Sequence, residues 1–248
     1  MRRLGIVLFF VLSAVLSGGI YYFLNTPKIL VTMTSTEKPI FASSQILRMM
    51  NQTYSNIRFN VSIKGMSDFA DYRIFSPEWR QYSDKKRLRV RRDKDKTPFL
   101  NWLDTMADTS LDQYDIVCLI KDENWYDPTY LETIARHFDP SHYDLLSVPD
   151  FLSVKWHTKT VGFEKTKAFH TDGNMCFTPK LVHQMVRLGQ NEHALKRLLP
   201  KAYHGFLKQV SPEIIAWYLA LKKNRIGVLN TPIPLMIQDE NIPVFSSY

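Results

Sequence analysis

The chain has 248 residues, of which 45% are hydrophobic and 23% are charged, and its formal net charge is +8 at pH 7. This is the composition of an ordinary globular protein, and the length is sufficient for one well-filled hydrophobic core. The sequence has no internal repeat, low-complexity stretch or linker-like segment, which excludes a repeat or low-complexity protein and indicates one globular domain.

The first segment of the chain is apolar and differs from the rest. Residues 4–24, LGIVLFFVLSAVLSGGIYYFL, carry no charge, and a helix that crosses a bilayer needs about 20 such residues. A cleaved signal peptide is the alternative, because Ser17, Gly18 and Gly19 are small residues of the kind found near cleavage sites. The apolar run continues beyond them and contains two tyrosines that suit a membrane interface, so we expect residues 1–27 to hold an uncleaved transmembrane signal-anchor.

The charges beside this segment predict its orientation. Arg2 and Arg3 precede it, and only Lys28 follows it closely. The positive-inside rule then places the N-terminus in the cytoplasm. We therefore expect a single-pass membrane protein whose globular part, residues 28–248, is lumenal or extracytoplasmic.

Strand-like and helix-like patterns alternate after the apolar segment. Residues 28–34 and 57–63 are β-rich runs, and residues 39–52 between them carry apolar side chains at helical spacing. Residues 85–92, KKRLRVRR, alternate basic and apolar side chains and are interpreted as a basic edge strand. The alternative is a site for nucleic acid, anionic lipid or diphosphate. No nucleic-acid partner is expected, because the run lacks interleaved aromatic residues.

The second half of the chain continues this alternation. Asp127 and Pro128 are predicted to cap and begin a helix that extends to Phe138. Cys118 and Cys176 lie in apolar surroundings and are expected to be buried thiols rather than a disulfide or a metal pair. The pattern indicates an α/β sandwich with a mostly parallel central sheet. The other predicted helices are residues 98–108, 179–189 and 211–224, the last capped by Ser211, and the other predicted strands are residues 114–120, 143–158, 167–178 and 225–231.

The predicted strand at residues 114–120 ends in the acidic cluster KDENWYDP, residues 121–128. Ligands of α/β sheets gather at the carboxyl ends of the strands. Clustered carboxylates at such an end are suitable oxygen ligands for a divalent metal. The alternative interpretation is a solvated polar turn before a helix.

Four stretches, in their order and spacing, resemble the nucleotide-sugar glycosyltransferases of the GT-A fold, most closely family 2. MMNQTYSNIRFNVSI (49–63) is similar to the segment between the family's first helix and second strand. Residues 87–108 resemble the segment that leads to the metal strand, and YDIVCLIKDENWYDPTYLE (114–132) resembles that strand with its aspartate-x-aspartate motif. Residues 211–235 resemble the helix that holds the catalytic carboxylate and the strand after it. The resemblance covers about residues 28–240 and implies a GT-A α/β/α sandwich.

The resemblance implies transfer of a sugar from a nucleotide-sugar donor to a hydroxyl of a glycan, lipid or polysaccharide acceptor. In such enzymes a divalent ion, Mn²⁺ or Mg²⁺, bridges the diphosphate of the donor. The two aspartate positions of the metal motif fall on Lys121 and Glu123, with Asp122 between them. Glu123 and Asp122 are therefore the candidate metal ligands, and Lys121 and Asp122 are candidate donor-binding residues, Lys121 through the diphosphate.

The resemblance also implies a catalytic base and sugar contacts. The acidic pair of the family's catalytic helix aligns with Glu213 and Ile214, so Glu213 is the candidate that deprotonates the acceptor hydroxyl. A glutamate in the first turn of a helix is equally consistent with a structural role. In HTDGN, residues 170–174, His170 and Asp172 are candidates for contacts with the donor sugar or the acceptor, and a simple turn is the alternative.

Four positions depart from the family's pattern: Lys121, Ile214, Lys64 at the end of the second predicted strand, and Gln238 where many relatives have a histidine. These departures keep two hypotheses open. The first is a membrane-anchored glycosyltransferase. The second is a catalytically degraded GT-A domain that binds a glycan or a partner without turnover.

Overall fold

The computed structural model describes residues 26–36, 39–64, 88–92, 98–122, 124–148, 150–155, 160–165, 175–207, 210–229 and 236–240. Three of the predicted site residues, Glu123, His170 and Asp172, lie outside the described residues, as does the apolar segment 4–24. None of the helices in the described part is long and apolar enough to cross a membrane.

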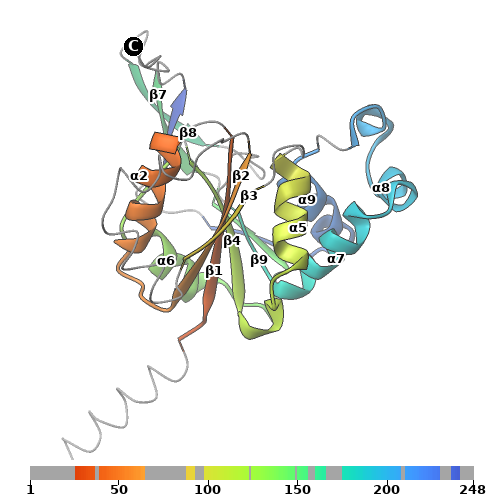
Figure 1. The fold of residues 1–248 in the computed structure, drawn as a ribbon, viewed down its shortest axis with the longest axis horizontal. Coiled ribbons are helices and arrows are strands. Elements are labelled where there is room, and N and C mark those ends of the chain that lie inside the picture. The colour runs from red at the N-terminus through yellow and green to blue at the C-terminus, as the bar shows by residue number, and fades with distance from the viewer. Residues whose placement is uncertain are drawn as a thin grey trace, which may run out of the picture.

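A seven-stranded sheet forms the centre of the domain, in the order β10-β6-β9-β4-β1-β2-β3 (Figure 1). Every neighbouring pair is parallel except those of β9, which is antiparallel to β4 and β6. The prediction of a mostly parallel central sheet is confirmed. The strands are β1 (Ile29–Thr36), β2 (Ile57–Lys64), β3 (Leu88–Arg92), β4 (Ile116–Lys121), β6 (Leu145–Ser147), β9 (Met175–Phe177) and β10 (Ile226–Val228).

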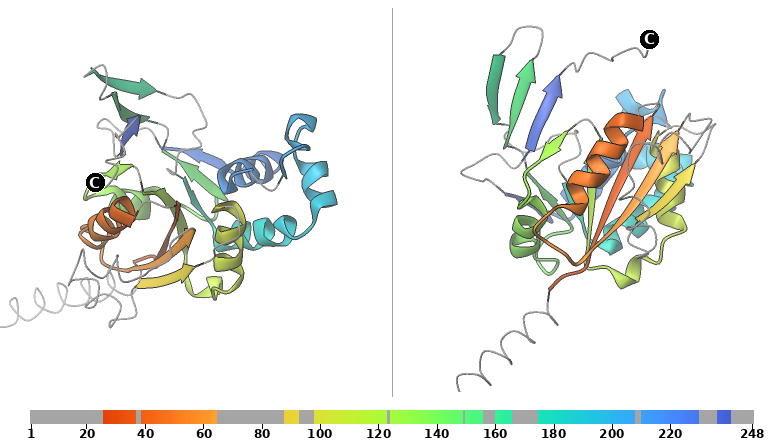
Figure 2. Two further views of the ribbon diagram at one scale, coloured as in Figure 1. Left: turned by 45° about the horizontal axis from the view of Figure 1, so that its top comes forward. Right: turned by 60° about the vertical axis from the view of Figure 1, so that its left-hand side comes forward.

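Helices cover both faces of this sheet (Figures 1 and 2). On one face, Ile29, Val31 and Met33 of β1 pack in a core with α2 (Pro39–Met50) and α6 (Tyr130–His137). On the other face, Leu30 packs in a core with α5 (Pro98–Ala107), α7 (Pro179–Gly189), α8 (Glu192–Leu198) and α9 (Pro212–Lys222). Side chains alternate across a strand, so the apolar runs of the sequence supply both cores at once.

A smaller, four-stranded sheet lies beyond the strand ends of the central one, in the order β5-β11-β7-β8 (Figure 2). The sequence patterns did not predict β5, β8, β11 or α8, and they joined residues 143–158 into one strand. That segment holds β6 and β7, which belong to different sheets. Pro149 falls between them in the sequence, and a proline cannot donate a hydrogen bond to a sheet. The strands of this sheet are β5 (Trp125–Tyr126), β7 (Asp150–Lys155), β8 (Thr160–Lys165) and β11 (Met236–Glu240).

The basic run contains the edge strand that its alternation predicts. Residues 88–92 form β3, which is the outermost strand of the central sheet and pairs in parallel with β2.

The start of α6 differs from the prediction. The helix begins at Tyr130, and Asp127 Oδ1 instead accepts hydrogen bonds from N and Oγ1 of Thr129 in a local turn. The backbone N–H of Leu131 donates to Gln52 Oε1 at 3.0 Å, and Gln52 Nε2 donates to the carbonyl of Asp127 at 2.8 Å. The prediction of Asp127 as the helix cap was wrong, because a glutamine from the loop after α2 satisfies the first turn.

The expectation for the cysteines was also wrong. Cys118 and Cys176 form a disulfide, at a sequence separation of 58. They lie directly opposite each other in the antiparallel pairing of β4 and β9, and both are fully buried. The apolar residues around each cysteine predicted its burial. They carry no information on which strands become neighbours, and it is the pairing of β4 with β9 that brings the two sulfur atoms together.

Candidate active site

The acidic cluster lies where β4 ends, at the edge of the central sheet that we call the carboxyl edge because β1, β2 and β4 all end there. Lys121 is the last residue of β4 and is paired in register with Thr34 of β1. Asp122 follows it and is 8% exposed. Ser35 Oγ, which is also buried, donates a hydrogen bond to Asp122 Oδ2 at 2.5 Å. The neighbouring strand therefore holds the carboxylate of Asp122 in a fixed orientation.

Strand alternation places Lys121 on the other side of the sheet from Asp122. Ile116, Cys118 and Ile120 face the core of α2 and α6, whereas Val117 and Leu119 face the core of α5, α7 and α9. Lys121 continues the second series and is partly buried. Its side chain therefore starts on the face of the sheet that α9 covers.

Glu213 lies in the first turn of α9 and is only 2% exposed. Negative charge is stabilised there by the partial positive charge of the helix N-terminus. Ser211 precedes the helix as the sequence predicts, but its hydroxyl makes no capping hydrogen bond and has no partner among the described residues. A carboxylate that is buried this deeply is costly to keep charged without compensating interactions, and Glu213 does interact with its surroundings.

The hydroxyl of Tyr126 contacts the acidic cluster at the end of β4. It accepts a hydrogen bond from the backbone N–H of Lys121 at 3.0 Å and forms another with the side chain of Asn124. Burial, followed by the neighbouring Tyr130, raises the pKa of Tyr126 well above its usual value, and the carboxylate of Glu213 raises it further. The two hydrogen bonds act in the opposite direction. The contribution of Glu213 is the smallest of these and places its side chain in the same region of the fold as Tyr126.

Trp125 gives the acidic cluster an exposed aromatic side chain. It is 47% exposed, and the guanidinium of Arg48 lies 3.5 Å from its ring centroid. Burial lowers the pKa of Arg48 from its usual value. This cation–π contact fixes the indole beside the cluster and links α2 to β5.

Sequence reasoning missed Ser35 and Arg48. Ser35 and Arg48 occur within segments that read as an ordinary strand and helix, and their relevance depends on which segments become neighbours. For Ser35 a signal exists, since it is a buried hydroxyl at the end of the strand that pairs with β4.

The predicted metal ligands are Asp122 and Glu123, of which the structure describes Asp122. Within the described residues, no three histidine, cysteine, aspartate or glutamate side chains come together as a metal site. A buried carboxylate at the end of β4, held through one oxygen by Ser35, fits one ligand of a hard divalent cation such as Mn²⁺ or Mg²⁺. The roles of Glu123, His170 and Asp172 stay predictions.

Neither a family model nor a curated protein sequence matches the chain. Solved structures match it at low sequence identity. S. aureus TarS 1–349 in complex with UDP-GlcNAc has a TM-score of 0.59 at 13% identity, over 89% of this chain and 61% of that one. S. aureus TarS has a TM-score of 0.58 at 12% identity, over 86% and 37%. The mannosyltransferase PcManGT from Pyrobaculum calidifontis, in complex with GDP-Man and Mn²⁺, has a TM-score of 0.54 at 12% identity, over 89% and 58%.

The chain thus spans between 37% and 61% of the length of these proteins. At 12–13% identity the similarity concerns the fold alone. The chain has the GT-A-like fold of nucleotide-sugar glycosyltransferases.

Proposed function

We propose that the chain is a glycosyltransferase that moves a sugar from a nucleotide-sugar donor to a hydroxyl of a glycan, lipid or polysaccharide acceptor. One observation carries the proposal. A buried carboxylate, Asp122, is oriented by Ser35 at the end of β4, and a second buried carboxylate, Glu213, lies in the first turn of α9. Sheets of this type bind their ligands at that edge.

Asp122 and Glu123 are the residues that would hold a divalent ion. Bound Mn²⁺ or Mg²⁺ would neutralise negative charge on the diphosphate of the donor. Lys121 would add a positive charge from the α9 side of the sheet, opposite to Asp122. A lysine at this place in the fold would lower the dependence of donor binding on the metal, because the ammonium group is part of the chain whereas the metal ion must bind from solution.

Glu213 would accept the proton of the acceptor hydroxyl while the acceptor oxygen bonds to the anomeric carbon and the nucleoside diphosphate leaves. Its position in the first turn of α9 is the place that the resemblance gives to the catalytic carboxylate. Trp125 and the predicted sugar contacts His170 and Asp172 would position the donor sugar or the acceptor.

We further propose that residues 1–27 anchor the chain in a membrane with a cytoplasmic N-terminus, and that the globular part is lumenal or extracytoplasmic. The charge-free run at residues 4–24 supports the anchor. The Cys118–Cys176 disulfide supports the orientation, because disulfides persist in oxidising compartments and are rare in the cytosol.

The second candidate is a degraded GT-A domain that binds a glycan or a partner without turnover. Lys121 favours it, because a cation terminates β4 where the resemblance has an aspartate. Under this hypothesis Asp122 and Glu213 are structural, and nucleotide-sugar is not consumed.

Turnover by the full chain in detergent separates the two candidates. Release of nucleoside diphosphate would be measured over a panel of UDP- and GDP-sugars, with and without Mn²⁺. The glycosyltransferase proposal predicts turnover with at least one donor, lost in Glu213→Gln and retained in Glu132→Gln. Glu132 is a matched control, since it is also a first-turn glutamate but lies on α6. Turnover that Glu213→Gln leaves intact would refute the assigned base. The absence of both turnover and nucleotide binding, the latter measured by calorimetry, would support the second candidate.

A further inference from the structure

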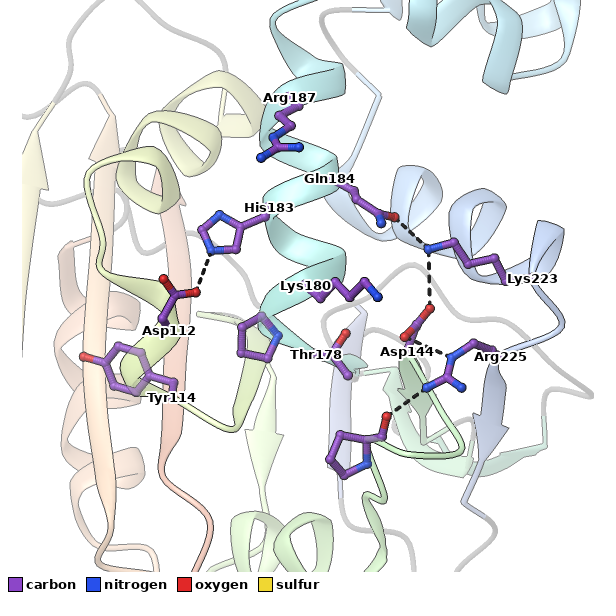
Figure 3. Close-up of a pocket in the computed structure, with 12 residues that line it drawn as sticks. Asp112, Tyr114, Asp144, Thr178, Lys180, His183, Gln184, Arg187, Lys223 and Arg225 are labelled. Carbon is purple, nitrogen blue, oxygen red and sulfur yellow. Dashed lines mark hydrogen bonds and ion pairs between the residues drawn. The ribbon is translucent and has the colours of Figure 1, made fainter.

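The structure has a groove of 1080 Å³ at the edge of the sheet where β1, β4, β6 and β10 begin, which we call the amino edge. This edge is opposite to the candidate active site. Figure 3 shows the side chains that surround the groove, which come from the residues just before β4, β6 and β10 and from α7. The lining residues are Asp112, Tyr114, Pro140, Asp144, Thr178, Pro179, Lys180, His183, Gln184, Arg187, Lys223 and Arg225.

Part of the charge in the groove is used to hold the fold. The buried Asp144 carboxylate pairs with Arg225 Nε at 3.1 Å and with Lys223 Nζ at 3.7 Å. Arg225 also donates to the carbonyls of Pro140 and Ser141. These contacts hold together the residues just before β6 and β10, which form one wall of the groove.

Another part of the charge is available to a ligand. Lys180 and Arg187 lie on one face of α7, and their exposed side chains have no hydrogen-bond or ion-pair partner among the described residues. Exposed His183 lies between them and contacts Asp112 at 3.3 Å. The lining contains four lysines or arginines and two aspartates, so its formal net charge is +2 with neutral histidine. The groove therefore favours an anion.

The chain enters the domain beside this groove. The carbonyls of Thr26 and Pro27 accept hydrogen bonds from Asn56 Nδ2 and Tyr54 Oη. The backbone N–H of Lys28 donates to Asp115 Oδ2 at 2.6 Å. Lys28 Nζ lies 4.9 Å from the ring centroid of Tyr114, which lines the groove.

The distance from this point to the apolar segment is short. Only Asn25 separates Leu24, the last residue of the apolar run, from Thr26. Two consecutive Cα–Cα steps span at most about 7.6 Å. If residues 4–24 cross a bilayer, the hydrogen bonds to Thr26 and Pro27 hold the amino edge of the sheet against the head-group layer.

We propose that the groove at the amino edge docks on the phosphate groups of anionic lipids in the membrane that anchors the chain. The inference rests on the proposed anchor, and it assigns Lys180 and Arg187 as the residues that contact the head groups. A lysine or arginine near an anionic bilayer contributes about 1 kcal/mol, or about a factor of five in binding. Loss of both charges is therefore expected to lower the ratio of docked to undocked protein by about 30-fold.

Docking in this orientation has a consequence for the acceptor. β1 runs from the amino edge to the carboxyl edge over 8 residues, which corresponds to about 26 Å at 3.3 Å per residue. The candidate active site would then face away from the bilayer. It would be accessible to a glycan in the aqueous phase or to the distal end of a long lipid-linked chain, and not to a sugar attached directly at the membrane surface.

The test uses the full chain in nanodiscs that contain either phosphatidylcholine alone or a mixture with phosphatidylglycerol, each doped with a phospholipid that carries a photoreactive head group. Cross-linked peptides are mapped by mass spectrometry. The proposal predicts cross-links to residues 178–187 and 222–225 in the anionic discs. It predicts that Lys180→Gln/Arg187→Gln lowers the ratio of docked to undocked protein by about 30-fold, so that the yield of these cross-links falls to that of a mostly undocked domain. The matched control Arg197→Gln/Lys201→Gln removes two exposed charges outside the groove and should leave the yield unchanged.

Each outcome separates the groove from the anchor. Resistance of the chain to carbonate extraction measures the anchor independently of the cross-links. An anchored chain whose cross-links map to the carboxyl edge, or are equal in both kinds of disc, overturns the groove assignment and leaves the anchor intact. A chain that carbonate extracts overturns the anchor, and the docking proposal with it. Cross-links that are equal in both kinds of disc, together with binding of inorganic phosphate to the chain in calorimetry, would assign the groove to free phosphate and would overturn the lipid assignment.

Discussion

Removing the hydroxyl of Ser35 tests whether the orientation of Asp122 depends on its neighbour strand. In Ser35→Ala the Asp122 carboxylate, 8% exposed, loses the donor that contacts its Oδ2. A hydrogen bond to a charged group contributes about 1.5–3 kcal/mol, and water cannot easily replace this donor at a buried site. We expect a loss of about 2 kcal/mol in the free energy of unfolding. For a chain of this size that corresponds to a decrease in Tm of about 4–8 °C.

Ser62→Ala is the matched control for this experiment. Ser62 lies on the adjacent strand β2, is 1% exposed, and its hydroxyl has no hydrogen-bond partner among the described residues. Deleting an unpartnered buried hydroxyl is expected to be neutral or stabilising. Both variants would be unfolded thermally in the same detergent and followed by circular dichroism. Equal decreases in Tm for the two variants would refute the reasoning, because the loss would then reflect packing and not the bond to Asp122.

Three further predictions concern the disulfide, the tyrosines and the cap of α6. Cys118→Ala/Cys176→Ala opens a loop with a sequence separation of 58 and should cost about 4 kcal/mol, so its Tm should equal that of reduced wild type and fall well below that of oxidised wild type. The folded state raises the pKa of Tyr126 above the usual value of 10.0, so the tyrosine ionises first in the unfolded chain and the stability should fall as the pH rises above about 10. Between about pH 9 and pH 11 the Tm of Tyr126→Phe should therefore fall less than the Tm of the wild type. An equal fall in the two proteins would contradict this. Gln52→Met removes both hydrogen bonds at the start of α6 and should lower the free energy of unfolding in urea by about 2 kcal/mol. Gln45→Met is the control, because it removes a fully buried amide without partners among the described residues and should be neutral or stabilising.

The sequence predicts those parts of the fold that depend on local periodicity. The apolar alternation of β2, the helical spacing of α2 and the buried run of β4 each identify their own element. The features that depend on contact between distant segments could not be read in this way. Gln52 caps a helix that begins far along the chain, and Cys176 meets Cys118 only because β9 inserts antiparallel beside β4.

The same division applies to the candidate site. Asp122 follows a buried strand, and the tendency of strand ends to carry ligands predicts that it lies at a functional edge. The approach of Glu213 to that edge was implied by the resemblance and not by any local pattern. Ser35 and Arg48 became identifiable only when β1 and α2 were seen beside the acidic cluster.

The most direct test of the central claim compares donor binding with donor turnover in Asp122→Asn and Glu213→Gln. Nucleotide-sugar binding would be measured by calorimetry in the presence of Mn²⁺, and turnover would be measured on the same samples at saturating donor. If Asp122 holds the metal and diphosphate while Glu213 is the base, Asp122→Asn should weaken binding by at least about 10-fold, which is about 1.4 kcal/mol. Glu213→Gln should bind normally and lose turnover by about 100-fold or more. Normal binding in Asp122→Asn, or normal turnover in Glu213→Gln, would contradict the account.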